Sequence, residues 1–182
     1  MEREKLLKIL KEKSYEKREV TLASGRKSDF YIDCKQTTLD PEGAYLTGKL
    51  IYKEIAALGG SIEGAGGLTL GADPIATAVS VASFEAGNPI PAFIIRKEPK
   101  GHGTGQWLEG TKNLKNGANV VIVEDVVTTG GSSMKAVKRA EESGLRVVKI
   151  VALVDRCEGG RENIEKEGYS LTSLFSKSDI VG

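Results

Sequence analysis

The sequence is poor in the residues that build metal centres and disulfides. Its 182 residues include two cysteines and one histidine, and these three stand far from one another along the chain. No zinc ligand set and no disulfide framework is therefore indicated. Cys34 and Cys157 are both interpreted as packing residues.

Charge of one sign and long apolar runs are also missing. The 26 Lys and Arg residues balance 25 Asp and Glu residues, so no overall field favours nucleic acid. No stretch approaches the roughly 18 apolar residues of a membrane helix, and the segment Met1–Lys5 is too charged to open a signal peptide. We expect a cytoplasmic protein that binds neither nucleic acid nor membrane.

What the chain does have is enough length and apolar content for one packed domain. Apolar residues make up 40% and charged residues 28% of the sequence, close to globular averages. The length suits a single domain spanning residues 1–182. Glycine is in excess, with 22 residues, which indicates that backbone approaches something closely.

The apolar pattern alternates between strand and helix periods. Val120–Val123 and Val147–Val154 are nearly continuous runs of the kind found in strands buried on both faces. The predicted order is helix 2–13, strands 19–22 and 29–33, helix 41–58, strand 64–70, helix 73–82, strands 91–96 and 119–123, helix 132–143, strand 146–154, helix 161–167 and strand 169–174. This order predicts an α/β fold with a parallel sheet and right-handed crossovers. Ligands of such sheets bind beyond the carboxyl ends of the strands.

The most informative segment is Asn119–Ser133, in which a buried strand ends on the carboxylates Glu124 and Asp125. The turn that follows supplies hydroxyls, two glycines and a helix N-terminus, which together can cradle a phosphate. Carboxylates would repel that phosphate, and they are better suited to accept hydrogen bonds from sugar hydroxyls. A phosphate next to a diol describes a ribose 5-phosphate unit.

An ordinary strand-to-helix turn is the simpler interpretation of this segment, but a helix cap needs only one Ser or Asp. This turn has six polar side chains and two glycines. The segment is neither a P-loop nor a dinucleotide-binding turn. The sequence lacks the P-loop motif G-x-x-x-x-G-K-[ST], and it lacks the dinucleotide-binding motif G-x-G-x-x-G after its first strand.

The segment Arg96–Gly110 concentrates basic residues and four glycines after a predicted strand. Such a composition is not expected in a packed core. A solvated surface loop is the alternative, but long unstructured loops are often functional. We expect a lid over about 97–111 that closes on a polyanion.

Val121–Ser133 resembles the phosphoribosyl-diphosphate (PRPP) binding segment of the type I phosphoribosyltransferases. The resemblance implies a central parallel five-stranded sheet flanked by helices, a small N-terminal hood largely from residues 1–40, and Mg²⁺ held mainly through PRPP rather than by direct protein ligands. It also implies transfer of ribose 5-phosphate from PRPP to a nitrogen. The PRPP-binding positions implied in this segment are Glu124, Asp125, Val126, Val127, Thr128, Thr129, Gly130, Gly131 and Ser132.

The basic loop narrows the resemblance, because Arg-Lys-x-x-Lys-x-His-Gly is similar to the lid of the orotate phosphoribosyltransferases. That family implies a homodimer in which each lid reaches the neighbouring site, with pyrophosphate bound by Arg96, Lys97, Lys100 and His102. The last two are the implied catalytic residues. Implied orotate contacts are Tyr31, Ile32, Thr128 and Arg156, whose guanidinium suits a carboxylate.

The chain departs from the family pattern at two positions, since many members carry lysines where this sequence has Ala23 and Gly71. Lys27 or Lys35 could substitute for these lysines, although ordinary surface solvation is the better explanation of either. Two alternative functions stay open. One is a type I phosphoribosyltransferase acting on purines or uracil, and the other is a PRPP-sensing regulator without catalysis. A regulator is expected to carry a DNA-binding helix pair or a basic RNA patch, and the sequence has neither.

Overall fold

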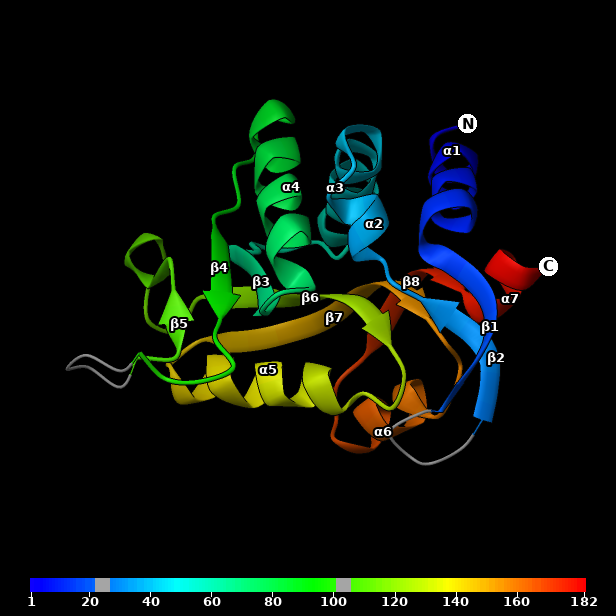
Figure 1. The fold of residues 1–182 in the computed structure, drawn as a ribbon. Helices are drawn as coiled ribbons and strands as arrows, with labels where there is room; N and C mark the ends of the chain where they lie inside the picture. The colour runs from blue at the N-terminus through cyan, green and yellow to red at the C-terminus, as the bar shows by residue number, and fades with distance from the viewer. Residues whose placement is uncertain (22–26, 101–105) are drawn as a thin grey trace.

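A six-stranded sheet forms the centre of the molecule (Figure 1). The computed structural model describes residues 1–21, 27–100 and 106–182. The strand order is β5 (Leu108–Glu109), β4 (Ala92–Ile95), β3 (Gly64–Leu68), β6 (Asn119–Val127), β7 (Arg146–Asp155), β8 (Leu171–Ser176). All neighbours are parallel except β4 and β5. The predicted five-stranded parallel sheet is confirmed, with one short antiparallel edge strand added.

Helices cover both faces of the sheet, which makes three layers (Figure 1). One face carries α3 (Pro41–Ala56) and α4 (Ala72–Glu85), and the other carries α5 (Gly131–Glu142) and α6 (Gly160–Lys166). Side chains of a strand alternate between these faces: Val121 and Val123 enter the core under α3 and α4, while Val120 and Ile122 enter the core over α5.

The N-terminal segment packs beside the sheet (Figure 1). It contains α1 (Glu2–Ile9), a π-helical turn (Leu10–Ser14), the antiparallel hairpin β1 (Tyr15–Thr21) and β2 (Lys27–Ile32), and the short helix α2 (Lys35–Thr38). The helix α7 (Lys177–Val181) closes the chain nearby. Leu6, Leu10 and Phe30 join the core of α3 and β7. The predicted N-terminal helix and two strands are therefore present, and they share one core with the sheet.

Some local expectations are wrong. Cys34 is buried, but Cys157 is exposed, because it lies in the turn after β7 with a φ of 56°. The sequence places Asp73-Pro74 where an N-cap and a first helical residue would stand, but α4 begins earlier, with Gly71 as its N-cap and Asp73 in its first turn. Leu108 is buried, since it pairs through β5 with the end of β4, so this part of the basic loop does belong to the core.

None of the helices in the described ranges has both the length and the apolar character needed to cross a bilayer.

Candidate functional site

Four parallel strands end at one edge of the sheet, and the predicted site residues follow them. Strands β3, β4, β6 and β7 end at Leu68, Ile95, Val127 and Asp155. The fold thereby brings the segments after residues 68, 95, 127 and 155 to one edge, together with the acidic end of β6, as expected for a ligand site in an open parallel sheet.

The two carboxylates of β6 lie in different environments. Glu124 is 4% exposed and turns toward α5, where the Ser133 hydroxyl donates to its Oε2 at 3.4 Å and the Asp125 backbone N–H donates to its Oε1 at 3.2 Å. Burial raises the pKa of Glu124 well above its usual range, and the adjoining Asp125 carboxylate raises it further. Glu124 therefore lies under the edge of the site and favours its protonated form.

Asp125 lies on the other face of β6, half-buried against the loop after β3. Its Oδ1 accepts the Val126 backbone N–H at 2.9 Å. A Cβ added to Gly71 would stand only 2.4 Å from Asp125 Oδ1. Any side chain at position 71 would displace the carboxylate. The observed position of Asp125 therefore requires glycine, rather than lysine, at position 71.

The turn from Val127 to Ser132 starts helix α5. Gly130 is its N-cap with a φ of 82°, a conformation that glycine adopts freely, and Thr129, Gly131 and Ser132 are exposed. A twelve-residue helix presents free N–H groups and a positive dipole end at this point. The arrangement suits an anion of phosphate size.

Helix α6 supports this turn from behind. The Asn163 side-chain amide donates to the Thr129 carbonyl at 3.0 Å. A Cβ at Gly160 would lie 2.5 Å from Val127 Cγ1 and 2.7 Å from the Thr128 carbonyl. The backbone of α6 thus holds the turn in place through the close approach of Gly130 and Gly160. The sequence does not reveal this contact, because the two glycines are 30 residues apart in the chain.

Arg156 connects the end of β7 to the hood hairpin. It is 8% exposed, and its Nη2 lies 3.0 Å from Glu158 Oε1 and 3.2 Å from the Phe30 carbonyl. Its guanidinium also lies 5.2 Å from the Phe30 ring centroid. The structure therefore brings Arg156 to β2, next to the predicted orotate segment, and adds Glu158 as a partner that sequence reasoning did not identify.

Tyr31 and Ile32 are neighbours on β2 and point to opposite faces. Ile32 packs against the main core, whereas the Tyr31 ring lies under the Arg18 guanidinium at 3.8 Å. Only one of the two side chains can face the same ligand.

The basic loop begins as an extension of the β4–β5 pair. Arg96 donates its backbone N–H to the Trp107 carbonyl at 2.8 Å, and Lys100 donates to the Gln106 carbonyl at 3.0 Å. Arg96 also pairs with Glu109 at 3.1 Å, while Lys97 and Lys100 are exposed. His102 lies outside the described residues.

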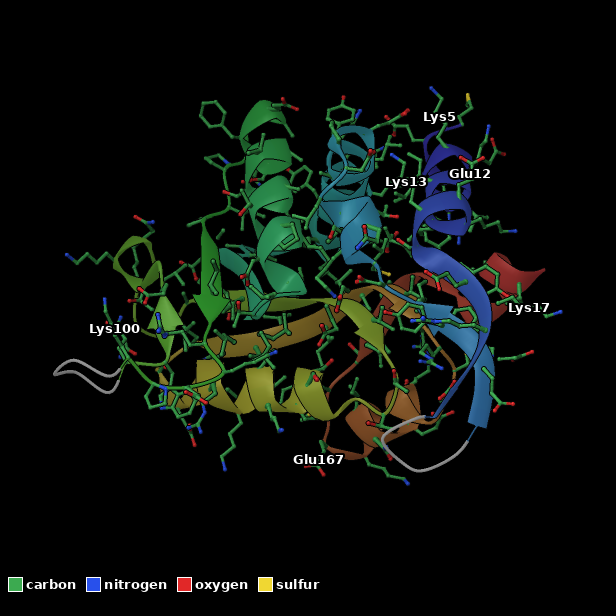
Figure 2. All side chains as sticks on the ribbon, in the orientation of Figure 1. Lys5, Glu12, Lys13, Lys17, Lys100 and Glu167 are labelled. Atoms are coloured by element: carbon green, nitrogen blue, oxygen red, sulfur yellow. The ribbon has the colours of Figure 1, made fainter. Side chains whose placement is uncertain are left out.

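Lys100 is far from Arg156 in this chain. Figure 2 shows Lys100 at one end of the molecule and Lys17 of the hood hairpin at the other, and Arg156 bonds to that hairpin through Phe30. The structure brings the acidic pair, the turn and Arg156 to one edge, but it does not bring Lys100 to them.

The proposed substitutes for the missing lysines have different outcomes. Ala23 lies outside the described residues, as does the side chain of Lys27. Lys35 Nζ forms an ion pair with Asp33 Oδ1 at 2.6 Å. This hydrogen bond raises the pKa of Lys35, and the charge of Asp125 adds to the shift, so Lys35 contributes positive charge on the Asp125 side of the site.

Residues 1–21, 27–100 and 106–182 contain no group of three His, Cys, Asp or Glu side chains able to hold a metal. The oxygen ligand that fits Mg²⁺ best at this edge is the half-buried Asp125 carboxylate. Mg²⁺ commonly binds one or two carboxylates together with substrate phosphates, so the residues present fit a metal that arrives with a phosphorylated ligand.

The model of the phosphoribosyl transferase domain family matches residues 65–178. The orotate phosphoribosyltransferase of Aquifex aeolicus is 50% identical over 184 residues, covering 100% of this chain and 98% of the relative. That of Sorangium cellulosum is 46% identical over 180 residues, covering 99% of this chain and 93% of the relative. The similarity therefore includes the hood and both ends of the chain.

Solved structures agree in fold. Mycobacterium tuberculosis orotate phosphoribosyltransferase with Fe(III) dicitrate has a TM-score of 0.85 at 37% identity, with 99% of each chain covered. The same enzyme with PRPP has a TM-score of 0.82 at 34% identity, with 100% of each chain covered. The match to an adenine phosphoribosyltransferase of Leishmania donovani has 18% identity and a TM-score of 0.65, and it covers 96% of this chain and 81% of the other. At this identity the likeness shows the fold alone.

Proposed function

The chain belongs to the orotate phosphoribosyltransferases, and from that membership we propose that it converts orotate and PRPP to orotidine 5′-monophosphate and pyrophosphate in UMP synthesis. One observation carries the proposal: the anion-binding turn 127–132, Asp125 and the buried Arg156 meet at one edge of the sheet. An enzyme that joins a phosphorylated sugar to a carboxylated base needs these three groups side by side.

The turn and the acidic pair would bind the ribose 5-phosphate part. Backbone N–H groups and hydroxyls of residues 128–132 donate to the phosphate. Asp125 accepts from the ribose hydroxyls, while Glu124 supports it from below. A protonated Glu124 lowers the negative charge near the phosphate, which favours binding of the anion.

Arg156 would hold the orotate carboxylate. A guanidinium binds a carboxylate in bidentate fashion, and Glu158 and the Phe30 carbonyl fix the side chain in position. Orotate bound there lies beside β2, with Thr128 as a further contact. Uracil, hypoxanthine and adenine lack the carboxylate and would not form this bidentate contact with Arg156, which costs them binding energy relative to orotate.

The lid residues Arg96, Lys97, Lys100 and His102 would stabilise the leaving pyrophosphate. Negative charge grows on the pyrophosphate oxygens as the bond to the ribose C1 lengthens, and fixed cations stabilise that charge. Closure of the lid also excludes water that would otherwise attack the sugar. Orotate itself needs orientation toward C1 more than it needs a strong base.

The distance between Lys100 and Arg156 supports a homodimer with shared lids. Because Lys100 and the hood lie at opposite ends of the chain (Figure 2), we propose that each lid serves the site of a second copy. Closed pairs of this kind are the commonest oligomers. The same proposal includes a cytoplasmic location.

Magnesium is the proposed cofactor, held mainly by PRPP with Asp125 near it. When bound, Mg²⁺ supplies charge neutralisation at the phosphate oxygens.

The test is the fall in orotate absorbance with purified protein, PRPP and Mg²⁺. We expect turnover with orotate and none with uracil, hypoxanthine or adenine. Arg156→Lys keeps the positive charge but loses the planar guanidinium that donates two hydrogen bonds to one carboxylate. The variant should raise the KM for orotate at least about tenfold with little change in the KM for PRPP. Turnover of uracil or a purine, or an unchanged orotate KM in the variant, would contradict the proposal.

A further inference from the structure

A buried ion pair anchors the turn that carries Arg156. Asp155 is the last residue of β7, and its side chain is 3% exposed. Its Oδ2 accepts a hydrogen bond from Arg161 Nη2, on α6, at 3.3 Å. We propose that Asp155 and Arg161 are positioning residues, which hold this turn so that Arg156 meets the carboxylate of orotate. The inference rests on the proposed function and adds to it two residues that act through Arg156.

Both carboxylate oxygens of Asp155 are used within the protein. While Oδ2 accepts from Arg161, Oδ1 accepts the backbone N–H of Cys157 at 2.8 Å. An aspartate that bonds to the backbone two residues ahead closes a tight turn. Here the turn includes the φ of 56° at Cys157, a conformation that residues other than glycine adopt rarely. The Asp155 side chain therefore stabilises the backbone on both sides of Arg156.

Arg161 connects this turn to the neighbouring strand. Its Nη1 donates to the carbonyl of Leu171, the first residue of β8, at 2.6 Å. A guanidinium suits such a double contact because its donors lie in one rigid plane. Arg161 therefore fixes the Asp155 carboxylate relative to the sheet, and the turn with it.

The turn determines where the Arg156 guanidinium lies. The Arg156 backbone N–H donates to the Val127 carbonyl at 2.9 Å, and the side chain pairs with Glu158, which belongs to the same turn. Both the backbone and the side chain of Arg156 thus depend on the segment that Asp155 holds. A bidentate contact with a carboxylate tolerates little displacement, so a shifted turn should weaken the binding of orotate.

A different residue of α6 supports the phosphate side of the site. Asn163 donates to the Thr129 carbonyl of the turn 127–132, whereas Arg161 bonds to the end of β7 and the start of β8. Loss of Arg161 should therefore affect orotate, and loss of Asn163 should affect PRPP. A merely structural role of α6 would not separate the two substrates in this way.

The test is the KM for each substrate, measured by the fall in orotate absorbance. Arg161→Met should raise the KM for orotate about tenfold or more and change the KM for PRPP by less than about twofold. Asn163→Ala should show the reverse split. Arg161→Lys keeps a cation for Asp155 and should recover part of the affinity for orotate.

The matched control is Glu165→Gln. Glu165 is the exposed partner of Arg161, 4.0 Å away on the same helix, and its loss should leave both KM values within about twofold of wild type. A lower melting temperature of Arg161→Met with both KM values unchanged would show a purely structural ion pair and overturn the inference.

A second variant guards against loss of folding, because Arg161→Met leaves a buried carboxylate without its cation. Asp155→Asn/Arg161→Met removes both charges and keeps an oxygen that can accept the Cys157 N–H. The double variant should still raise the KM for orotate at least about fivefold. A wild-type KM for orotate in the folded double variant would overturn the inference.

Hydrogen exchange of the Arg156 Nε proton provides a readout that needs no substrate. This N–H donates to Glu158 Oε1 at 3.2 Å on a buried side chain, so it should exchange slowly with water. NMR of Arg161→Met should show exchange at least about tenfold faster, with the signal identified by its loss in Arg156→Lys. Faster exchange in a protein that does not turn over orotate would support the positioning of Arg156 and contradict the proposed function. An unchanged exchange rate would overturn the inference.

Discussion

At the scale of single residues, Glu124 and Asp125 show how one strand gives two neighbouring carboxylates different chemistry. Alternation along β6 turns Glu124 under the sheet toward Ser133 and Asp125 toward the loop that contains Gly71. The first is a buried acid with a raised pKa, and the second is the acid that a bound sugar can contact.

Glu124→Gln tests the buried acid through the pH dependence of stability. Because the folded chain raises the pKa of Glu124, the folded state binds a proton that the unfolded state releases at lower pH. Stability from this group is present at low pH and is lost as pH rises from the usual glutamate range through the raised value. Glutamine has no charged form, so the variant should gain about 1 kcal/mol or more relative to wild type between pH 5 and pH 8.

Urea unfolding at the two pH values measures this difference. Glu85→Gln is the control, since Glu85 is exposed on α4 and its removal should leave the pH dependence unchanged. The free energy of unfolding could instead fall in parallel for the wild-type protein and Glu124→Gln as pH rises. That result would show that Glu124 is ionised in the folded protein and would contradict the prediction.

Gly71→Ala tests the position of Asp125. The added methyl group would stand 2.4 Å from Asp125 Oδ1, and the carboxylate must move away from the site. We expect kcat/KM for PRPP to fall by roughly one to two orders of magnitude, measured in the orotate assay at saturating orotate.

The cause can be separated by a double-mutant cycle. In an Asp125→Ala background the space beside position 71 is free, so Gly71→Ala should add little further loss. Equal losses in both backgrounds would mean that Gly71 acts independently of Asp125.

Single residues also show where sequence reasoning ends. The acids, the turn and Arg156 were predictable because their types and order in the chain carry the chemistry. Glu158, Gly160 and Asn163 were missed, since each acts through a contact with a distant segment. Cys157 was assigned to the core on residue type alone, yet the backbone of its turn directs it to solvent.

At the scale of elements, the β4–β5 hairpin determines where the predicted lid begins. Strand β5 has only two residues, too few for a period-2 pattern, so the sequence of 97–111 resembles one continuous loop. Pairing of Leu108 with Ile95 buries Leu108 and anchors the returning arm. The helices and longer strands were predicted well, because their hydrophobic periods extend over many residues.

Lys100→Ala tests the lid as an electrostatic element. Lys100 is exposed on the outgoing arm of the hairpin, and its removal should lower kcat by about two orders of magnitude, as for the loss of one stabilising group. Lys112→Ala, in the exposed turn after β5, is the matched control and should retain wild-type turnover. Near-normal kcat in Lys100→Ala would remove this lysine from the mechanism.

At the scale of the whole molecule, the separation of Lys100 from the hood is the basis of the proposal that two chains form each complete site. Mixing Lys100→Ala subunits with Arg156→Ala subunits tests this arrangement. If lids are shared, each mixed dimer has one site with both residues intact, and activity should return to about a quarter of wild type after exchange. If each lid serves its own chain, the mixture stays as inactive as its components.

The proposed activity depends most on PRPP binding at the acidic end of β6, and a crystal structure of the protein soaked with PRPP tests that binding directly. We expect the 5′-phosphate to accept hydrogen bonds of about 3 Å from backbone N–H groups of residues 128–132, with the ribose hydroxyls on Asp125. PRPP bound at another place, or a ribose that leaves Asp125 without contact, would contradict the account.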